Sequence, residues 1–297
     1  PTLKWLAESN HYLVTLAEDS YPKALLETPD PPPILFAIGN PGLLNRAAVA
    51  IVGSRNATAQ GQVNAHYFAK ALSNAGLCVV SGLALGIDAA AHRGALEASA
   101  ATIAVLGCGA DIAYPKFNTS LYNEIAECGL IVSEFPIGTP PRPGHFPRRD
   151  RIIAGLSLGC LVVEGALSSG SLITARFSAD LGREVFALPG SIHSPHSKGC
   201  HALIKQGAAL VESSNDILEQ LNHLATNDQQ STRDATAVRQ SKIHPVFPNP
   251  EILGIDHPLL QYIGYDPIDV DTLTERSGLT PGAVSAMLLE LELDGRV

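Results

Sequence analysis

The hydrophobic positions of the chain fall into short unbroken runs separated by longer amphipathic stretches. The unbroken runs cover residues 48–52, 77–80, 102–106, 130–132, 160–163, 185–188 and 208–211. Between them, apolar residues recur at helical spacing, at 60–75, 87–98, 119–128 and 172–181. Strands that are apolar throughout are typical of a parallel sheet covered on both faces, wound by right-handed crossovers. The pattern therefore predicts a Rossmann-like α/β domain, with a doubly wound and mostly parallel sheet, at residues 46–224.

The two ends of the chain predict further segments. Residues 1–45 contain two turn-rich stretches, and we expect them to form an N-terminal extension that feeds the sheet. Residues 225–253 lose the apolar periodicity and gain polar residues and proline, which indicates a linker. Residues 254–297 hold three short helix-like segments, with Gly278 and Pro281 at helix boundaries. This layout predicts a small winged-helix-like α domain whose wing would begin where the sequence ends.

Composition is that of a globular protein. The chain has 297 residues, of which 45% are apolar and 16% charged, which is ample for a buried core. No run approaches the ~18 consecutive apolar residues that a membrane helix needs, and the first residues lack the regions of a secretory signal. The five cysteines include no C-x-x-C pair, which favours reduced thiols. We therefore expect a cytoplasmic protein without a membrane partner.

The net charge of -9 is unevenly distributed. Residues 212–297 carry all of it, with 14 acidic and 5 basic side chains, whereas residues 1–211 hold 15 of each. Within that neutral part, the segment 142–151 (RPGHFPRRDR) contains four arginines, one acid and the interleaved Phe146. Such a basic loop is typical of single-stranded nucleic-acid binding, where the ring stacks on a base and guanidinium groups contact phosphates. A solvated loop with scattered surface ion pairs would explain it equally well.

Four glycine turns follow predicted strands, at the carboxyl ends where ligands collect in an open parallel sheet. They lie at 53–55, 81–86, 107–109 and 165–171. None matches a nucleotide fingerprint. The turn at 107–109 has the first two glycines of G-x-G-x-x-G but lacks the third, and in the turn at 165–171 Ser171 stands where a P-loop needs lysine. We therefore expect no cofactor and no NTPase activity. A single turn of this kind is often an ordinary tight turn, but four together predict a cradle of amides and hydroxyls suited to phosphates.

Other candidate chemistry is weaker. Asp88 and His92 would share one helix face, but a first-turn acid and a core histidine explain them better, because no nucleophile can be assigned beside them. Ser168 and Ser169 lack the G-x-S-x-G elbow of a hydrolase. One short segment (SIHSPHSKGCH) collects potential metal ligands, but their spacing matches no zinc pattern; they are His193, His196, Cys200 and His201. The residues thus predict binding groups rather than catalytic ones, and no metal site.

Several long motifs occur in order along the chain. They are VGSRNAT at 52–58, VVSGLALGIDAAAHRGAL at 79–96, AVLGCGADIAYPK at 104–116, FPRRDRIIAGLS at 146–157, GSLITARFSADLGREVFALPG at 170–190 and GCHALIKQGA at 199–208. In these motifs the sequence resembles the DprA family, also called Smf, the DNA-processing proteins of natural transformation. The resemblance runs from about residue 20 to the end, and residues 278–295 resemble the winged-helix module of that family.

The resemblance implies a non-enzymatic protein that binds single-stranded DNA without sequence preference, protects incoming DNA during competence and loads the RecA recombinase for recombination. It implies a homodimer formed through the Rossmann-like domain, and a SAM-like N-terminal domain of which residues 1–45 would keep only the end. It places DNA binding at Gly53, Ser54, Arg55, Lys116, Arg142, Phe146, Arg148, Arg149, Arg151, Ser168, Ser169 and Gly170. The sequence departs from the family at Asp150 and His201, where asparagine is usual. Asp150 puts a negative charge between two of the arginines.

The last helix-like segment, 281–293, contains no Lys or Arg but includes Glu290 and Glu292. A major-groove reader brings cations to the phosphates, so we expect DNA binding to belong to the neutral body and not to the tail. Two other functions stay open from sequence. One is a nucleotide-processing hydrolase on a related Rossmann-like fold, although the turn at 165–175 lacks the glutamate of that class. The other is a winged-helix transcription regulator, which would need specific duplex binding by the tail.

Overall fold

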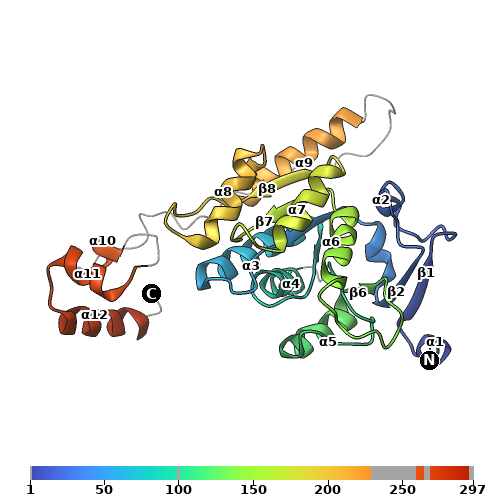
Figure 1. Cartoon of the computed structure of the whole chain (residues 1–297), viewed down its shortest axis with the longest axis horizontal. Coiled ribbons are helices and arrows are strands. Elements are labelled where there is room, and N and C mark those ends of the chain that lie inside the picture. Colours follow the sequence, from blue (N-terminus) through green and yellow to red (C-terminus); the bar gives the residue numbers. More distant parts are fainter. Residues whose placement is uncertain (1, 99–100, 229–258, 264–267, 294–297) are drawn as a thin grey trace. The chain divides into compact units, whose positions relative to one another are not determined.

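The computed structural model describes residues 2–98, 101–228, 259–263 and 268–293 (Figure 1). The chain divides into two compact units, Pro1–Arg233 and Asp234–Val297. The first unit is an α/β domain built on one sheet, and the second is a small group of helices. Both classes of structure are those that the sequence predicts.

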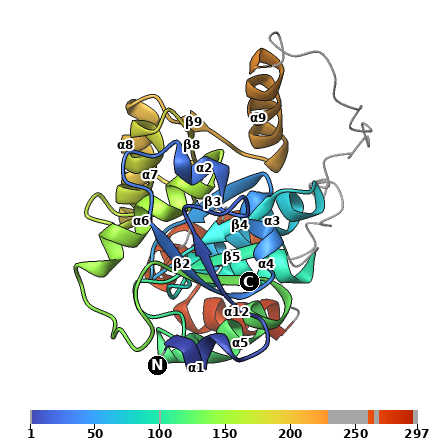
Figure 2. The ribbon, with the colours of Figure 1, turned by 90° about the vertical axis from the view of Figure 1, so that its right-hand side faces the viewer.

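The sheet of the first unit has nine strands in the described residues, in the order β1-β2-β6-β5-β4-β3-β7-β8-β9. All neighbouring strands from β6 to β9 pair in parallel, whereas β2 pairs antiparallel with both β1 and β6. The strands are β1 (His11–Thr15), β2 (Ile34–Gly39), β3 (Ala48–Val52), β4 (Cys78–Ser81), β5 (Thr102–Val105), β6 (Leu130–Ser133), β7 (Gly159–Val162), β8 (Glu184–Ala187) and β9 (Ala209–Leu210). The N-terminal extension thus supplies the two antiparallel strands, which Figure 2 shows in dark blue.

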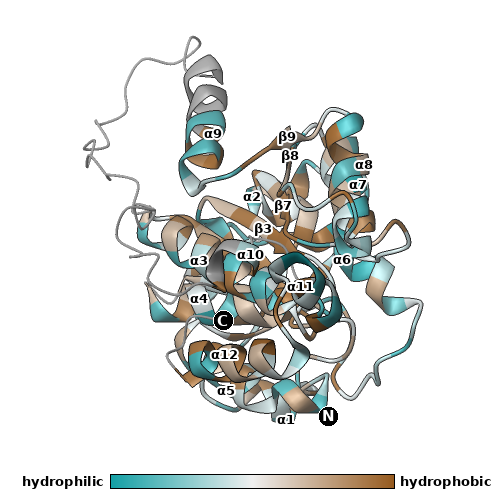
Figure 3. Ribbon diagram, turned by 90° about the vertical axis from the view of Figure 1, so that its left-hand side faces the viewer, coloured by the Kyte–Doolittle hydropathy of each residue, from teal (hydrophilic) through white to brown (hydrophobic). Residues whose placement is uncertain are grey.

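Helices cover both faces of the sheet, as its wholly buried central strands require. Side chains that alternate along β3 point to opposite faces: Val49 and Ile51 pack with one layer, Ala50 and Val52 with the other. In Figure 3 the central strands are largely hydrophobic, while the surrounding helices also carry hydrophilic positions. One layer contains α3 (Ala59–Asn74), α4 (Ile87–Glu97) and α9 (Ser214–Asp228), and the other contains α2 (Lys23–Leu26), α6 (His145–Leu156), α7 (Ser171–Asp180) and α8 (Lys198–Lys205).

Short helices complete the first unit. Helix α5 (Thr119–Cys128) joins the layer of α4, and α1 (Thr2–Leu6) packs there through the buried Trp5. Among the described residues, the connections include the 3-10 turns η1 (Pro41–Asn45), η2 (Lys116–Asn118) and η3 (Pro195–Ser197).

The basic segment at 142–151 differs from the loop that the sequence predicts, because helix α6 begins inside it at His145. Pro147 lies in the first turn, where its missing N–H group has no intrahelical partner to lose. Ile152, Ile153 and Leu156 then anchor the helix to the sheet. The aromatic ring of Phe146 and three of the arginines are therefore presented by a rigid helix.

The second unit contains α10 (Leu260–Ile263), α11 (Val270–Ser277) and α12 (Pro281–Leu293). Asp269 caps α11 by accepting a hydrogen bond from the backbone N–H of Thr272, and Gly278 ends it in the left-handed conformation at φ 65°. The boundaries at Gly278 and at Pro281, where α12 begins, are those expected from sequence, whereas the Asp269 cap was not predicted. The expected linker lies largely outside the described residues, and so does the start of the expected wing. No helix in the described part of the chain is long and apolar enough to cross a membrane.

Candidate nucleic-acid interface

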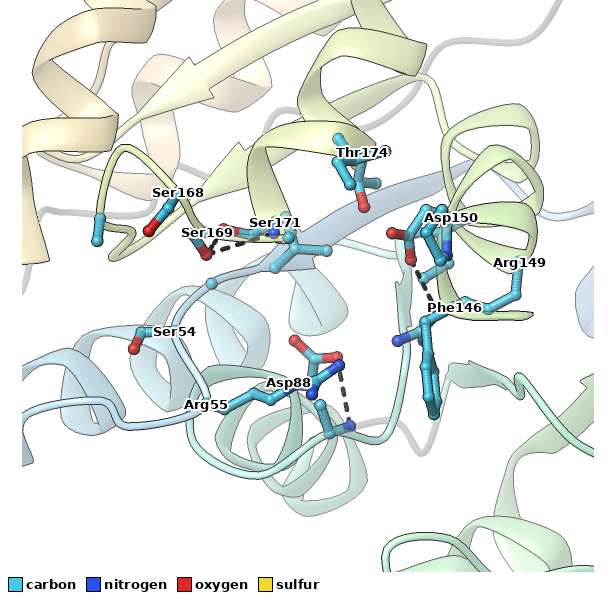
Figure 4. Close-up of a pocket in the computed structure, with 18 of the residues that line it drawn as sticks. Ser54, Arg55, Asp88, Phe146, Arg149, Asp150, Ser168, Ser169, Ser171 and Thr174 are labelled. Carbon is cyan, nitrogen blue, oxygen red and sulfur yellow. Dashed lines mark hydrogen bonds and ion pairs between the residues drawn. The ribbon is translucent and has the colours of Figure 1, made fainter. Parts of the chain in front are cut away.

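A cavity of about 600 Å³ opens beside β3, at the carboxyl end of the sheet. The chain runs outward from β3 through β4, β5 and β6, and then returns to the other side of β3 to form β7. This reversal leaves a crevice between the loops that follow β3 and β7, which is where open α/β sheets bind ligands. Figure 4 shows the side chains that meet there, from the loop after β3, the starts of α4 and α6, and the turn before α7.

One wall of the cavity is the turn that leads into α7. Ser168, Ser169 and Gly170 line it, and the hydroxyls of Ser169 and Ser171 are 2.7 Å apart. Helix α7 has no acidic residue in its first turn and no side-chain cap. Because the N-terminus of a helix carries a partial positive charge and serine hydroxyls can donate hydrogen bonds, this wall is suited to an anion such as phosphate.

The opposite wall combines a cation with aromatic rings. The guanidinium carbon of Arg55 lies over the Phe146 ring, 5.4 Å from its centre, and the centre of the Tyr114 ring lies 5.7 Å from that of Phe146. Phe146 packs so closely on the backbone at Gly107 that a Cβ there would lie 2.9 Å from the ring. Glycine after β5 therefore lets the ring settle against the sheet edge. The wall thus holds a guanidinium over the face of one aromatic ring, with a second ring next to it.

The floor of the cavity is a buried cluster of one arginine and two acids. Arg149 donates from Nη1 to the carbonyl of Val105 at 3.0 Å, and its Nε lies 2.8 Å from Oδ1 of Asp150. Asp88 accepts hydrogen bonds from the backbone N–H groups of Gly82 (3.1 Å) and Ala84 (3.3 Å). Burial raises the pKa of Asp88, and it raises the pKa of Asp150 to about 6, while Arg149 opposes both shifts.

The charges of the cavity are thus arranged with the free cation at the rim and the acids at the floor. Arg55 is exposed at the rim, whereas the Asp88 and Asp150 carboxylates share a single buried guanidinium. A phosphate group would meet hydroxyls and a cation at the rim, and carboxylates deeper in. The geometry therefore favours a ligand whose phosphates stay at the rim.

The structure brings together eight of the twelve residues that the resemblance singled out. Those that line the cavity are Gly53, Ser54, Arg55, Phe146, Arg149, Ser168, Ser169 and Gly170. The other four, Lys116, Arg142, Arg148 and Arg151, lie outside the cavity wall. Lys116 and Arg142 are exposed on neighbouring loops, so they can still extend the same surface.

Two arginines of the basic segment, Arg149 and Arg151, bind other groups of the protein. Arg151 is bound to the Glu134 carboxylate, to the backbone carbonyl of Asp30 and to the Asp30 carboxylate. Arg149 is almost completely buried in the cluster described above. Arg148 also pairs with Glu134 at 3.1 Å, but its side chain is 60% exposed. We therefore propose that Arg149 and Arg151 position the site, in place of the direct DNA contact expected from the resemblance.

Sequence reasoning did not assign Tyr114, Asp88 or Asp150 to the binding site. Tyr114 lines the cavity and packs near Phe146, and its position in the loop after β5 was a usable signal. Asp88 and Asp150 also line the cavity. Their meeting around Arg149 could not be predicted, because it depends on how α4 and α6 pack from opposite faces of the sheet.

Two of the histidines weighed as catalytic or metal-binding candidates form hydrogen bonds within the protein. His92 bonds through Nδ1 to the hydroxyl of Thr102 at 2.7 Å, and burial lowers its pKa to about 3, so the ring is neutral. His201 bonds to the carbonyl of Gly190. Within the described residues, no group of three or more His, Cys, Asp or Glu side chains could hold a metal ion.

The first helix after β3 is the usual place for a pyrophosphate in a Rossmann-like fold. Here Glu164 takes that place, because its carboxylate accepts hydrogen bonds from the backbone N–H of Thr58 (3.0 Å) and from the Thr58 hydroxyl (2.6 Å). A Cβ at Gly61 would lie 2.3 Å from this carboxylate. The N-terminus of α3 is therefore filled by an anion of the protein itself.

The fold and the cavity define a Rossmann-like α/β protein with a basic, aromatic rim at the switch point of its sheet. Comparison with family models gives the particular family. Residues 12–222 match the model of DNA recombination-mediator protein A, and residues 248–297 match the DprA winged helix domain. The chain belongs to the DNA recombination-mediator protein A (DprA) family, as its motifs indicate.

Individual relatives agree with this assignment. The chain is 41% identical to protein Smf of Escherichia coli over 99% of this chain and 77% of that protein. It is 47% identical to DNA processing protein DprA of Streptococcus pneumoniae over 69% of this chain and 72% of that protein. The crystal structure of the S. pneumoniae protein matches with a TM-score of 0.68 and 45% identity, covering 71% of this chain and 74% of that one.

A second solved structure bears on the ligand. DNA processing protein A of Helicobacter pylori matches with a TM-score of 0.65 and 32% identity, covering 74% of this chain and 99% of that one. That structure was described for its single-stranded DNA binding mode.

Proposed function

We propose that this protein binds single-stranded DNA without sequence preference at the cavity beside β3, protects incoming DNA and loads the RecA recombinase onto it during natural transformation. The single observation that carries the proposal is the rim, where the serine turn before α7 lines the same cavity as Arg55 and Phe146. Serine hydroxyls, a helix N-terminus and a guanidinium bind phosphates, and an aromatic face stacks on any base. This combination binds a strand without reading its sequence.

The family and its H. pylori member support the same ligand, because the structure of that member was described for single-stranded DNA binding. The RecA partner, the homodimer formed through the Rossmann-like domain and the cytoplasmic location follow from the family resemblance and are part of this proposal. A dimer would place two rims on one strand and raise the effective affinity without any new contact.

The proposal is tested by fluorescence anisotropy of a labelled oligothymidylate against the wild type and the double variant Arg55→Ala with Phe146→Ala. Arg93→Ala is the matched control, because Arg93 is exposed on α4 and does not line the cavity. We expect the double variant to lose binding and the control to keep it. A duplex of the same length should bind more weakly. Equal binding by wild type and double variant would place the site elsewhere.

A second candidate function rests on the two floor carboxylates. Asp88 and Asp150 line a cavity large enough for a nucleotide, and the raised pKa of Asp150, about 6, is of the kind found at acid–base sites. A nucleotide hydrolase would use such a pair. We propose instead that the protein does not catalyse a reaction, because both acids are engaged, Asp88 with two backbone N–H groups and Asp150 with Arg149. Release of free base from nucleoside monophosphates, abolished by Asp150→Asn, would favour the hydrolase.

A further inference from the structure

An aromatic side chain outside the cavity stands free on the surface. Phe117 is 85% exposed, the highest value for a large apolar side chain in the described part of the chain. It lies in the 3-10 turn η2, which follows the cavity residue Tyr114 by two positions. Covering an exposed phenylalanine with a ligand is favourable, because it removes apolar surface from water. Its neighbours indicate which partner that is.

The turn that carries Phe117 is fixed in place. The buried side chain of Asn118 donates hydrogen bonds to the carbonyls of Leu83 (3.0 Å) and Ala84 (3.2 Å), which belong to the loop after β4. On the same turn, the hydroxyl of Thr119 donates to the carbonyl of Lys116 at 2.7 Å. The Phe117 ring therefore projects from a held backbone. A ring held in this way loses less conformational entropy when a ligand stacks on it.

The same turn continues the aromatic wall of the cavity. Tyr114 contacts the cavity and lies 5.7 Å from Phe146, centre to centre. Three residues of chain span at most about 11 Å, so Phe117 lies within that reach of Tyr114. Stacked bases rise by about 3.4 Å each, so this reach corresponds to two or three nucleotides. A strand that leaves the rim can thus arrive at Phe117 without a gap.

The charge beside Phe117 favours a nucleic acid over a protein surface. Lys116 is exposed and makes no ion pair within the described residues. The residues that follow Phe117 are polar, Asn118, Thr119 and Ser120. An exposed ring beside an exposed lysine, with the partly exposed Tyr114 nearby, is the pattern of a base-stacking platform.

We propose that Phe117 is a second base-stacking residue, which takes an unpaired base of the strand just outside the cavity while Lys116 holds the adjoining phosphate. The inference rests on the proposed function. The inference adds to the proposed function a binding surface that runs from the rim along η2, so that the protein engages a strand longer than the cavity alone can hold.

The test compares oligothymidylates of about three and about twelve nucleotides by anisotropy competition. We expect Phe117→Ala to raise the Kd of the longer strand about fivefold or more, the lower end of one lost stack, and to leave the shorter one unchanged. Tyr12→Ala is the matched control, because Tyr12 is a 39% exposed aromatic on β1 at the far edge of the sheet. It should change neither Kd.

A spectroscopic measurement separates stacking from a general structural effect. The protein has one tryptophan, Trp5, which is buried. Phe117→Trp adds a second, exposed indole whose emission should be quenched saturably by the longer strand, with the wild-type Kd restored. Quenching should disappear when Arg55→Ala is added.

The measurements distinguish failure of the proposed function from failure of the stacking role of Phe117. Failure of the wild type to bind either strand would overturn the proposed function itself. Wild-type binding that Phe117→Ala leaves unchanged, with no quenching in Phe117→Trp, would overturn only the stacking role. A fall in molar mass of Phe117→Ala in sedimentation, with unchanged DNA affinity, would assign the ring to contact with a second copy of the chain and would also overturn it.

Discussion

Gly82→Ala is expected to displace the Arg149 guanidinium from the floor of the cavity. Gly82 follows β4, and a Cβ at this position would lie 1.4 Å from Nη1 of Arg149. No real atom pair tolerates that distance, so the guanidinium must leave its place. Arg149 would then lose its hydrogen bond to the carbonyl of Val105 and its close pairing with Asp150.

The size of the effect combines the lost hydrogen bond with the cost of overpacking. A hydrogen bond from a charged group contributes about 1.5–3 kcal/mol, and forcing atoms into a packed interior costs about 1–3 kcal/mol. We therefore expect Gly82→Ala to lower the free energy of unfolding by about 3–5 kcal/mol. That is a large fraction of the roughly 5–15 kcal/mol that stabilises a typical domain.

Urea unfolding followed by the fluorescence of Trp5 measures this change in the first unit alone, because the chain has a single tryptophan and it is buried there. Gly144→Ala is the control: a Cβ there meets nothing within 4 Å, and the backbone is at φ -69°. It should be neutral or slightly stabilising. A destabilisation of Gly82→Ala within about 1 kcal/mol of this control would refute the view that Arg149 is locked in place.

Three further predictions follow. In urea titrations, Asp150→Asn should gain stability relative to the wild type as the pH rises from about 4 to 6. The reason is that the pKa of Asp150 is about 6 in the folded state and ~3.9 in the unfolded state, so ionisation of Asp150 destabilises the folded wild type. No gain across that range would contradict the raised pKa. Arg151→Ala should lower the unfolding free energy by about 3 kcal/mol, because it leaves the buried Glu134 without this partner, yet keep the Kd for single-stranded DNA; a weakened Kd at equal folding would make Arg151 a DNA contact. Removing residues 229–297 should leave that Kd unchanged, because α12 contains no Lys or Arg; a tenfold loss in anisotropy would assign binding to the second unit.

The parallel strands could be predicted because strands buried on both faces are apolar at every position of the sequence. A run such as 48–52 is apolar at every position and is buried on both sides. Strand β1 could not be predicted in this way, because only Val14 among its five residues is fully buried. It forms through pairing with β2, at the edge of the sheet, which the hydrophobic pattern of a single segment does not reveal.

The site was predictable at its rim and not at its floor. Glycine turns after strands indicate a ligand edge because parallel strands end together. Arg148 and Arg149, however, are adjacent in sequence and have opposite fates: the first is largely exposed, and the second is buried against Gly82. Which of them turns inward is decided by the rotation of α6 on the sheet, set by Ile152, Ile153 and Leu156. Charge counting alone could not separate them.

The most direct test of the central claim is the salt dependence of single-stranded DNA binding. Each phosphate contact on a single strand contributes about 0.7 to the slope of log K against log salt concentration. We predict that Arg55→Ala weakens binding to oligothymidylate and lowers this slope by about 0.7, while Arg93→Ala leaves both at the wild-type values. Identical slopes for the two variants and the wild type would contradict the account, because Arg55 would then contact no phosphate and the rim of the cavity would not be the binding site.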